Sequence, residues 1–238
     1  MRKHLIFHFC VNESTGWAKA HIDKLEKHID LFDGYRFFSI CEPNDNLKDN
    51  GLVDRILKLA NSRTTINYIK NDTISREVKP FFDMHLPALK LLKEENDYCF
   101  YGHTKGSSHG YSNALNAWNT TLWKYNIEKY EECIAPHIGN YKTIGCLRKT
   151  REKAGANVGD YIIESFHFSG TFFWFSCDIL NRDDWFDPNR SSPWVIERWP
   201  GIISDLSDSV SVFDLEESEE YYYDHFWDKH NVKGNMQL

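Results

Sequence analysis

The fold of this chain is decided by one stretch near its middle, Tyr98-Cys99-Phe100-Tyr101-Gly102-His103-Thr104-Lys105-Gly106. Its first four residues are all apolar or aromatic, which is typical of a strand buried on both faces. The strand runs without a break into a polar loop flanked by two glycines. In an open parallel sheet, ligands bind beyond the carboxyl ends of the strands. The stretch therefore predicts an α/β protein with a ligand site at the end of this strand.

Upstream of this strand, short apolar runs alternate with segments in which apolar residues recur at helical spacing. The runs predict strands at residues 5–11, 35–41 and 64–69, and the spaced segments predict helices at residues 18–31, 52–60 and 75–92. This alternation predicts a Rossmann-like domain with a mostly parallel central sheet flanked by helices.

Downstream of residue 110 the pattern is looser. Residues 114–133 predict a helix, residues 141–147 predict a strand, and residues 166–177 form an unusually aromatic segment that reads as one strand. Residues 204–215 fit neither pattern. Because no repeat or low-complexity linker interrupts the chain, we expect a single domain over residues 1–238.

Composition narrows the function classes. The chain has 238 residues and 41% hydrophobic content, enough for one substantial core. Its net charge of −7 counts against binding nucleic acid through phosphates. The six cysteines are isolated and form no CxxC pair, so a zinc site of the usual spacing is not expected. The apolar run after Met1 is too short and too polar for a signal or transmembrane segment, so we expect a reduced, cytoplasmic protein.

Three polar loops follow predicted strands, at residues 12–16, 42–46 and 102–110, and the third is the most informative. Glycines allow a backbone to approach phosphates closely, while Lys105 and nearby hydroxyls supply donors to anionic oxygens. An ordinary polar surface turn is the alternative for this loop. By position, Asn12 together with Glu42 and Asn44 would lie near a base or ribose.

Two further motifs follow later in the chain, His167-Phe168-Ser169-Gly170-Thr171-Phe172-Phe173-Trp174 and Glu197-Arg198-Trp199-Pro200-Gly201. A Ser-Gly pair within an aromatic strand marks a place where the backbone meets a ligand or another chain segment, and the alternative is a bulge in a core strand. The second motif puts a carboxylate beside an aromatic ring before a turn, and the alternative is a solvated surface glutamate.

Taken in order, the three motifs resemble a family of GT-A-like glycosyltransferases found in bacterial surface-polysaccharide loci and in large viruses and phages. Members show a strand ending in His-Thr-Lys-Gly, a later Ser-Gly-Asn-Phe-Trp-Trp-like strand, and an acidic residue next to Trp. The resemblance covers residues 65–200. This chain departs from the pattern at Thr171, where the family tends to have Asn. It also has His103-Thr104-Lys105 where GT-A enzymes usually carry a metal-binding Asp-x-Asp.

The resemblance implies transfer of a hexose or pentose from a nucleotide-sugar donor to a glycan or glycoconjugate acceptor. Residues 1–110 would then form the nucleotide-binding half and residues 111–238 the acceptor-side half. The implied donor contacts are Asn12, Arg76, His103, Thr104, Lys105, Gly106, Ser169, Gly170 and Thr171.

The same resemblance makes Glu197 the base that deprotonates the acceptor hydroxyl, with Glu164 and Asp178 as alternatives. His167 would be a base, a sugar contact or a structural residue, and Trp174 and Trp199 would stack on sugars or pack in the core. For the diphosphate, either Lys105 neutralises the leaving group directly, or His103 helps to hold Mn²⁺ or Mg²⁺.

Two other functions stay open. A phage-type enzyme that glycosylates DNA bases would need a basic groove, for which Arg148, Lys149, Arg151 and Lys153 are candidates. A non-catalytic nucleotide- or carbohydrate-binding module would keep the donor site without turnover. A P-loop kinase is set aside, because the Gly-x-x-x-x-Gly-Lys-Ser/Thr spacing is absent.

Overall fold

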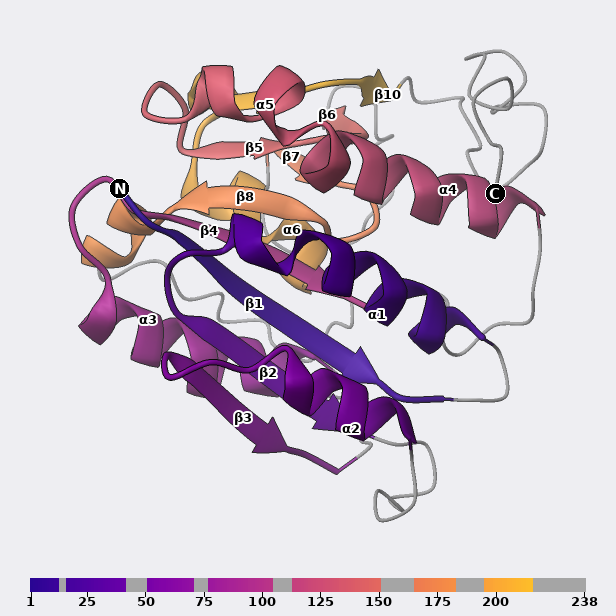
Figure 1. Cartoon of the computed structure of the whole chain (residues 1–238). Helices are drawn as coiled ribbons and strands as arrows, with labels where there is room; N and C mark the ends of the chain where they lie inside the picture. Colours follow the sequence, from indigo (N-terminus) through magenta and orange to yellow (C-terminus); the bar gives the residue numbers. More distant parts are fainter. Residues whose placement is uncertain are drawn as a thin grey trace.

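A seven-stranded sheet with helices on both faces forms the centre of the molecule (Figure 1). The computed structural model describes residues 1–12, 16–41, 51–70, 77–104, 113–150, 165–182 and 195–215. The strand order is β3-β2-β1-β4-β8-β5-β9, and a second, three-stranded sheet has the order β10-β6-β7. Strands β1 to β4 are mutually parallel, so the predicted α/β class with a mostly parallel, Rossmann-like sheet is confirmed.

The bounds of the elements are as follows. The larger sheet contains β1 (Lys3–Cys10), β2 (Arg36–Cys41), β3 (Thr64–Tyr68), β4 (Tyr98–His103), β5 (Thr143–Gly145), β8 (Phe173–Ser176) and β9 (Ser209–Ser211). The smaller sheet contains β6 (Arg148–Thr150), β7 (Phe166–Phe168) and β10 (Asp214–Leu215). The helices are α1 (Trp17–His28), α2 (Gly51–Lys58), α3 (Leu86–Leu92), α4 (Asn113–Trp123), α5 (Tyr130–Cys133) and α6 (Val195–Ile203). Short 3-10 turns occupy Ile29–Leu31, Ala135–His137, Cys177–Asn181 and Leu206–Asp208, and π-helical segments occupy Pro80–His85 and Lys124–Glu128.

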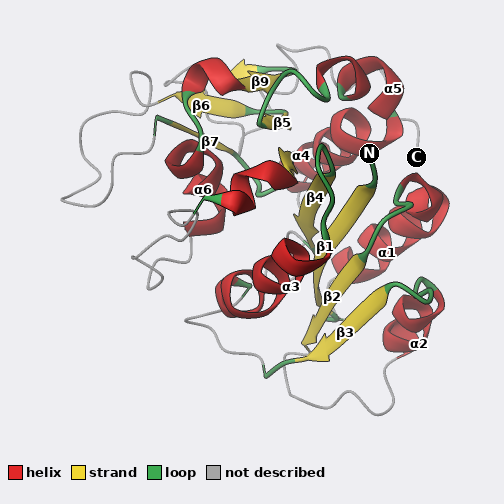
Figure 2. Cartoon of the chain, turned by 90° about the vertical axis from the view of Figure 1, so that its left-hand side faces the viewer, coloured by secondary structure: helices red, strands yellow, loops and turns green. Residues whose placement is uncertain are grey.

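Two hydrophobic cores lie on opposite faces of the sheet. Helices α1, α2 and α4 cover one face, while α3 and α6 cover the other (Figure 2). The central strand β1 contributes to both cores, because successive side chains of a strand point to opposite faces: Phe7 joins the first core and Ile6 the second. Helix α1 buries Ala18, Ile22 and Leu25, which share one helical face.

The carboxyl ends of three neighbouring strands meet at one edge of the sheet. Strand β1 lies between β2 and β4, with Cys10 opposite Cys41 and His8 opposite His103. The chain passes from β1 to β2 on one side and reaches β4 on the other side. The topological switch point, where open α/β sheets bind ligands, therefore lies between β1 and β4.

The aromatic segment at residues 166–177 is two strands rather than the single strand that its composition predicts. Strand β7 belongs to the small sheet, and β8 is antiparallel to both β4 and β5 in the large one. Between them, Gly170 has φ 94° and Thr171 has φ 59°. These left-handed conformations end an extended strand, and the chain turns here from one sheet to the other.

The structure refines two local predictions. The described part of the helix predicted over residues 75–92, in which Pro80 and Pro87 are potential breaks, is helical, with a π-helical segment from Pro80 to His85 that passes into α3 at Leu86. The Glu197-to-Gly201 motif, which suggests a residue before a turn, lies inside α6. No helix in the described ranges is long and apolar enough to cross a membrane.

Candidate functional site

The first two motifs meet at the carboxyl edge of β4. In the antiparallel pair of β4 and β8, Tyr101 lies opposite Phe173. Continuing this register, the residues that follow Tyr101 lie beside those that precede Phe173. The ring of His103 is 6.3 Å from the ring of Phe172. The pairing therefore brings the turn at residues 169–171 beside the end of the His-Thr-Lys-Gly strand.

The third motif joins them through a buried hydrogen bond. The backbone N–H of Gly170 donates to Glu197 Oε1 at 2.8 Å. Glu197 is only 8% exposed, and it comes from α6, which packs against β7. All three motifs that the sequence singles out thus converge at one edge of the sheet, next to the switch point between β1 and β4.

The 169–171 turn requires glycine at position 170. Thr171 N–H donates to the carbonyl of Phe168 at 3.3 Å, and Gly170 occupies the third position of this turn with φ 94°. Such a φ at this position favours glycine strongly. A Cβ on Gly170 would also lie 2.7 Å from Leu122 Cδ1 and 3.0 Å from Trp118 Nε1, in α4. Conformation and space therefore both exclude a side chain here.

Backbone strain gathers around this turn. Thr171 and Leu147 both have φ 59°, although neither is glycine. A β-branched residue in this region is a conformational outlier. The two are linked through Ser169, whose N–H donates to the carbonyl of Leu147 at 3.0 Å. Strained residues cluster at binding and catalytic sites because surrounding contacts hold them there.

Thr104 fastens the start of the glycine-flanked loop to β1. Its hydroxyl accepts from Cys10 N–H at 2.8 Å and donates to the Cys10 carbonyl at 3.3 Å, and its own N–H donates to the His8 carbonyl at 3.0 Å. The hydroxyl, which the sequence predicts to contact phosphate, is engaged within the protein. Asn12 lies at the same place, with its N–H donating to the Cys10 carbonyl at 3.0 Å.

The described residues at this edge do not form a divalent-metal site. His103 Nδ1 lies 3.7 Å from Glu77 Oε1, and both side chains are largely buried. Mg²⁺ and Mn²⁺ prefer several oxygen ligands, whereas this pair offers one carboxylate and one imidazole. Nowhere in the described ranges are three His, Cys, Asp or Glu side chains grouped so that they could hold a metal ion.

Two buried histidines lie beneath this edge on the α3 side, and the sequence patterns do not identify them as part of a site. Burial lowers the pKa of His8 to about 4, and its Nδ1 lies 2.9 Å from Ser39 Oγ. Burial, with a smaller effect from His8, lowers the pKa of His85 to about 3. Both imidazoles are therefore neutral at pH 7. Neither imidazole therefore supplies a positive charge at this edge of the sheet at pH 7.

The two tryptophans of the motifs have packing roles. Trp174 is fully buried and donates from Nε1 to the Asn126 carbonyl at 3.0 Å, and Trp199 is fully buried against the ring of Phe175 at 5.1 Å. Of the two uses that the sequence leaves open, sugar stacking and core packing, the structure places both indoles in the second. His167 lies in β7 opposite Lys149, two residues before Ser169.

Several predicted residues lie outside the described ranges. These are Glu42, Asn44, Arg76, Lys105, Gly106, Arg151, Lys153 and Glu164. Of the basic residues proposed for a DNA groove, Arg148 and Lys149 are described, and both lie in β6. The guanidinium of Arg148 pairs with Asp214 at 2.8 Å and donates to the Ser209 carbonyl at 2.8 Å.

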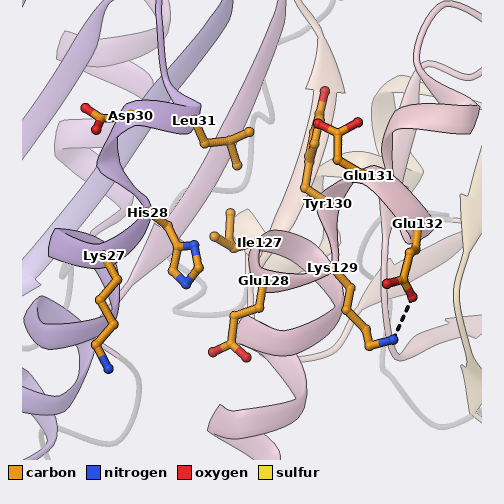
Figure 3. Close-up of a pocket in the computed structure, with 10 residues that line it drawn as sticks. All are labelled: Lys27, His28, Asp30, Leu31, Ile127, Glu128, Lys129, Tyr130, Glu131 and Glu132. Carbon is orange, nitrogen blue, oxygen red and sulfur yellow. Dashed lines mark hydrogen bonds and ion pairs between the residues drawn. The ribbon is translucent and has the colours of Figure 1, made fainter.

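A separate hollow of about 280 Å³ opens at the other edge of the sheet (Figure 3). Its walls come from the end of α1 with the turn after it, and from residues 127–132. Lys3, the first residue of β1, has its Nζ 5.8 Å from the centre of the Tyr130 ring in this wall, which locates the hollow at the amino end of the strands. None of the motif residues that the structure describes lines it.

Comparisons with known proteins give a distant structural likeness. No protein-family model matches the chain, and no curated protein matches it. Among solved structures, it is similar to a Bacillus anthracis protein assigned as a glucose-1-phosphate thymidylyltransferase, in complex with sucrose. The TM-score is 0.42 and the identity 10%, over 99% of this chain and 96% of that one.

Proposed function

We propose that this protein is a glycosyltransferase that moves a sugar from a nucleoside-diphosphate sugar to an acceptor hydroxyl of a glycan or glycoconjugate. The observation that supports the proposal is the convergence of the three ordered motifs at one sheet edge. Residues separated by almost a hundred positions, His103, Gly170 and Glu197, gather there beside the switch point. Chance turns and surface glutamates would have no reason to share this edge.

In this proposal the nucleotide lies over the ends of β1 and β2, and the diphosphate lies at the end of β4. Lys105 follows β4 directly after Thr104, whose three hydrogen bonds to β1 hold the start of the loop. Since His8 and His85 are neutral at pH 7, we assign the neutralisation of the leaving diphosphate to Lys105, with Arg76 as a second cation. A fixed cation stabilises the negative charge that develops as the sugar leaves.

Glycosylation of DNA bases has less support as an alternative. The net charge is −7, and Arg148, one of the two described residues of the proposed basic groove, is paired with Asp214. A non-catalytic binding module would share the same donor site, so only turnover separates it from the transferase.

The test is a thermal-shift screen of nucleoside diphosphates and nucleotide sugars, each with and without Mn²⁺. A ligand at 100 times its Kd stabilises the folded state by about 2.7 kcal/mol, which raises the melting temperature by several degrees. We expect Lys105→Gln to weaken the shift given by diphosphates, while Lys19→Gln, an exposed change on α1, leaves it unchanged. Absence of a shift with every nucleotide contradicts the proposal. Binding without release of nucleoside diphosphate in the presence of acceptors identifies a binding module instead.

A further inference from the structure

Glu197 is the carboxylate to which the resemblance gives proton removal. We infer that it acts instead as a positioning residue, which clamps the strained 169–171 turn against the end of β4. The clamp itself does not depend on the proposed function. Only its effect on kinetics rests on the proposed function, because that effect is measured in the sugar-transfer reaction.

The first argument is the contact that Glu197 makes. Its Oε1 accepts the backbone N–H of Gly170 at 2.8 Å, and both residues are buried. A hydrogen bond to a charged acceptor is stronger than one between neutral groups. Removing the carboxylate would leave a buried backbone N–H without its partner, which is unfavourable in the folded state. The carboxylate is thus bound to the turn rather than aimed solely at a substrate.

The second argument is that the turn needs to be held from outside. Gly170 at φ 94° and Thr171 at φ 59° are consecutive left-handed residues, and threonine disfavours this conformation. Strain of this kind persists only where the surroundings fix it. The Leu147 carbonyl binds Ser169 N–H at 3.0 Å on one side, and Glu197 binds Gly170 N–H on the other. These two contacts form the clamp.

The third argument is that the helix carrying Glu197 is itself fixed to the strand before the turn. A Cβ on Gly201 would lie 1.8 Å from the Phe166 carbonyl oxygen, so α6 and β7 are in direct backbone contact. Ser165 adds two hydrogen bonds to the Gly201 carbonyl, from N–H and Oγ, both at 3.3 Å. Glu197 lies four residues before Gly201, on the same face of the helix. The helix that carries Glu197 and the strand that leads into the turn are therefore held against each other.

The position of the turn matters for the site because its next residue reaches the donor edge. Phe172 follows Thr171 directly, and its ring lies 6.3 Å from the ring of His103. If the clamp is released, the turn relaxes and the surface beside β4 changes shape. We expect the loss to appear mainly as weaker donor binding, because the effect passes through the shape of the site.

The deciding experiment compares Glu197→Gln with Glu197→Ala in the full chain. Glutamine keeps an acceptor oxygen in the same place but cannot take a proton near neutral pH. A positioning role predicts that Glu197→Gln keeps kcat within about threefold and leaves the pH profile unchanged, whereas a base would lose on the order of 10² to 10⁴ in kcat. Glu197→Ala should raise the KM for donor about tenfold if the competent turn falls to about a tenth of the population, because apparent affinity scales with the fraction of competent molecules. Glu132→Gln, an exposed change in α5, is the matched control.

A second readout does not depend on substrate. Hydrogen exchange at the Gly170 amide, followed by NMR, should stay slow in Glu197→Gln and become at least tenfold faster in Glu197→Ala, which loses the acceptor. A large kcat loss in Glu197→Gln with the Gly170 amide still protected overturns the inference and makes Glu197 the base. Unchanged protection in Glu197→Ala also overturns it. If the wild type transfers no sugar, the proposed function fails, and the exchange result alone decides whether the clamp exists.

Discussion

Position 171 carries threonine where the proteins that this chain resembles tend to have asparagine, and its backbone has φ 59°. Asparagine is enriched in the left-handed region, because its short side chain bonds locally, while threonine is disfavoured there by its branched Cβ. Threonine at this position therefore gives a strained backbone at the centre of the candidate site.

Thr171→Asn should therefore stabilise the protein. Relief of left-handed strain at a β-branched residue is worth about 1 kcal/mol in the free energy of unfolding. Urea unfolding measures this as a higher midpoint at an unchanged slope. Thr65→Asn, at an exposed position in β3 with ordinary backbone geometry, should give no gain. An equal gain at both positions would show that strain is not the cause.

Single residues of the site are only partly predictable from sequence. The Gly102-to-Gly106 and Ser169-to-Thr171 motifs were identifiable because glycine and serine are unusual within apolar, aromatic strands. The partner of Glu197 was not, since Gly170 lies 27 residues away and nothing in the local pattern joins them. The role of Trp174 could not be predicted for a related reason. Strand β8 is buried on both faces, so its aromatic residues do not indicate which face, if either, would contact a ligand.

At the scale of elements, α6 shows tertiary packing overriding local signals. Pro200 followed by Gly201 is a turn signal in sequence, yet both lie inside the helix. Gly201 is there because the helix crosses β7 in backbone contact, and no larger residue allows that approach. A single sequence without its tertiary contacts cannot distinguish a glycine required for packing from one required for a turn.

Gly201→Ala should strongly destabilise the fold. Its Cβ would lie 1.8 Å from a backbone oxygen, which no side-chain movement can relieve, so α6 has to shift away from β7. We expect a loss of about 3 kcal/mol or more in the free energy of unfolding, at the upper end for overpacking.

Gly51→Ala is the matched control, because Gly51 lies in α2 and no described atom lies within 4 Å of the added Cβ. Alanine is the better helix former, so this change should gain up to about 1 kcal/mol. Thermal unfolding of the two variants gives the comparison. A Gly201→Ala protein as stable as the wild type would mean that α6 does not pack on β7 in this way.

At the scale of the whole molecule, the strand order of the first half follows from sequence, whereas in the second half single elements such as α4 and β5 are predicted but the strand order is not. Alternating strands and helices up to Tyr101 predict parallel strands, because a parallel connection needs a helix to cross back. The insertion of β8 between β4 and β5 could not be predicted, since strand direction depends on a turn at Gly170 and Thr171 that lies within one continuous aromatic run.

Global stability should fall in mild acid because of the buried histidines. Burial lowers the pKa of His8 from 6.5 to about 4 and that of His85 to about 3. As the pH falls, the unfolded chain is therefore protonated at these histidines before the folded protein is. The stabilisation is fully present above pH 6.5 and is lost as the pH falls through 6.5 towards 4. For His8 alone it amounts to on the order of 3 kcal/mol.

His85→Phe should reduce this pH dependence, since it removes a titrating ring whose two nitrogens have no hydrogen-bond partner among the described residues. The slope of unfolding free energy against pH between 4.5 and 6.5, from urea titrations, is the measurement. Leu89→Met, a packing change in the same core, should shift stability equally at every pH. A wild-type slope in His85→Phe would show that His85 does not contribute to the pH dependence of stability.

The strand order has one more consequence, for the behaviour of the protein in solution. Strand β3 ends the seven-stranded sheet and pairs, within the described ranges, with β2 alone. Its outer N–H and C=O groups form a template on which a second chain can add a strand, and Tyr68 there is 54% exposed. Arg63 and Lys70 flank this segment with positive charge. Positive charges beside an open edge repel those of a second molecule, which disfavours edge-to-edge pairing.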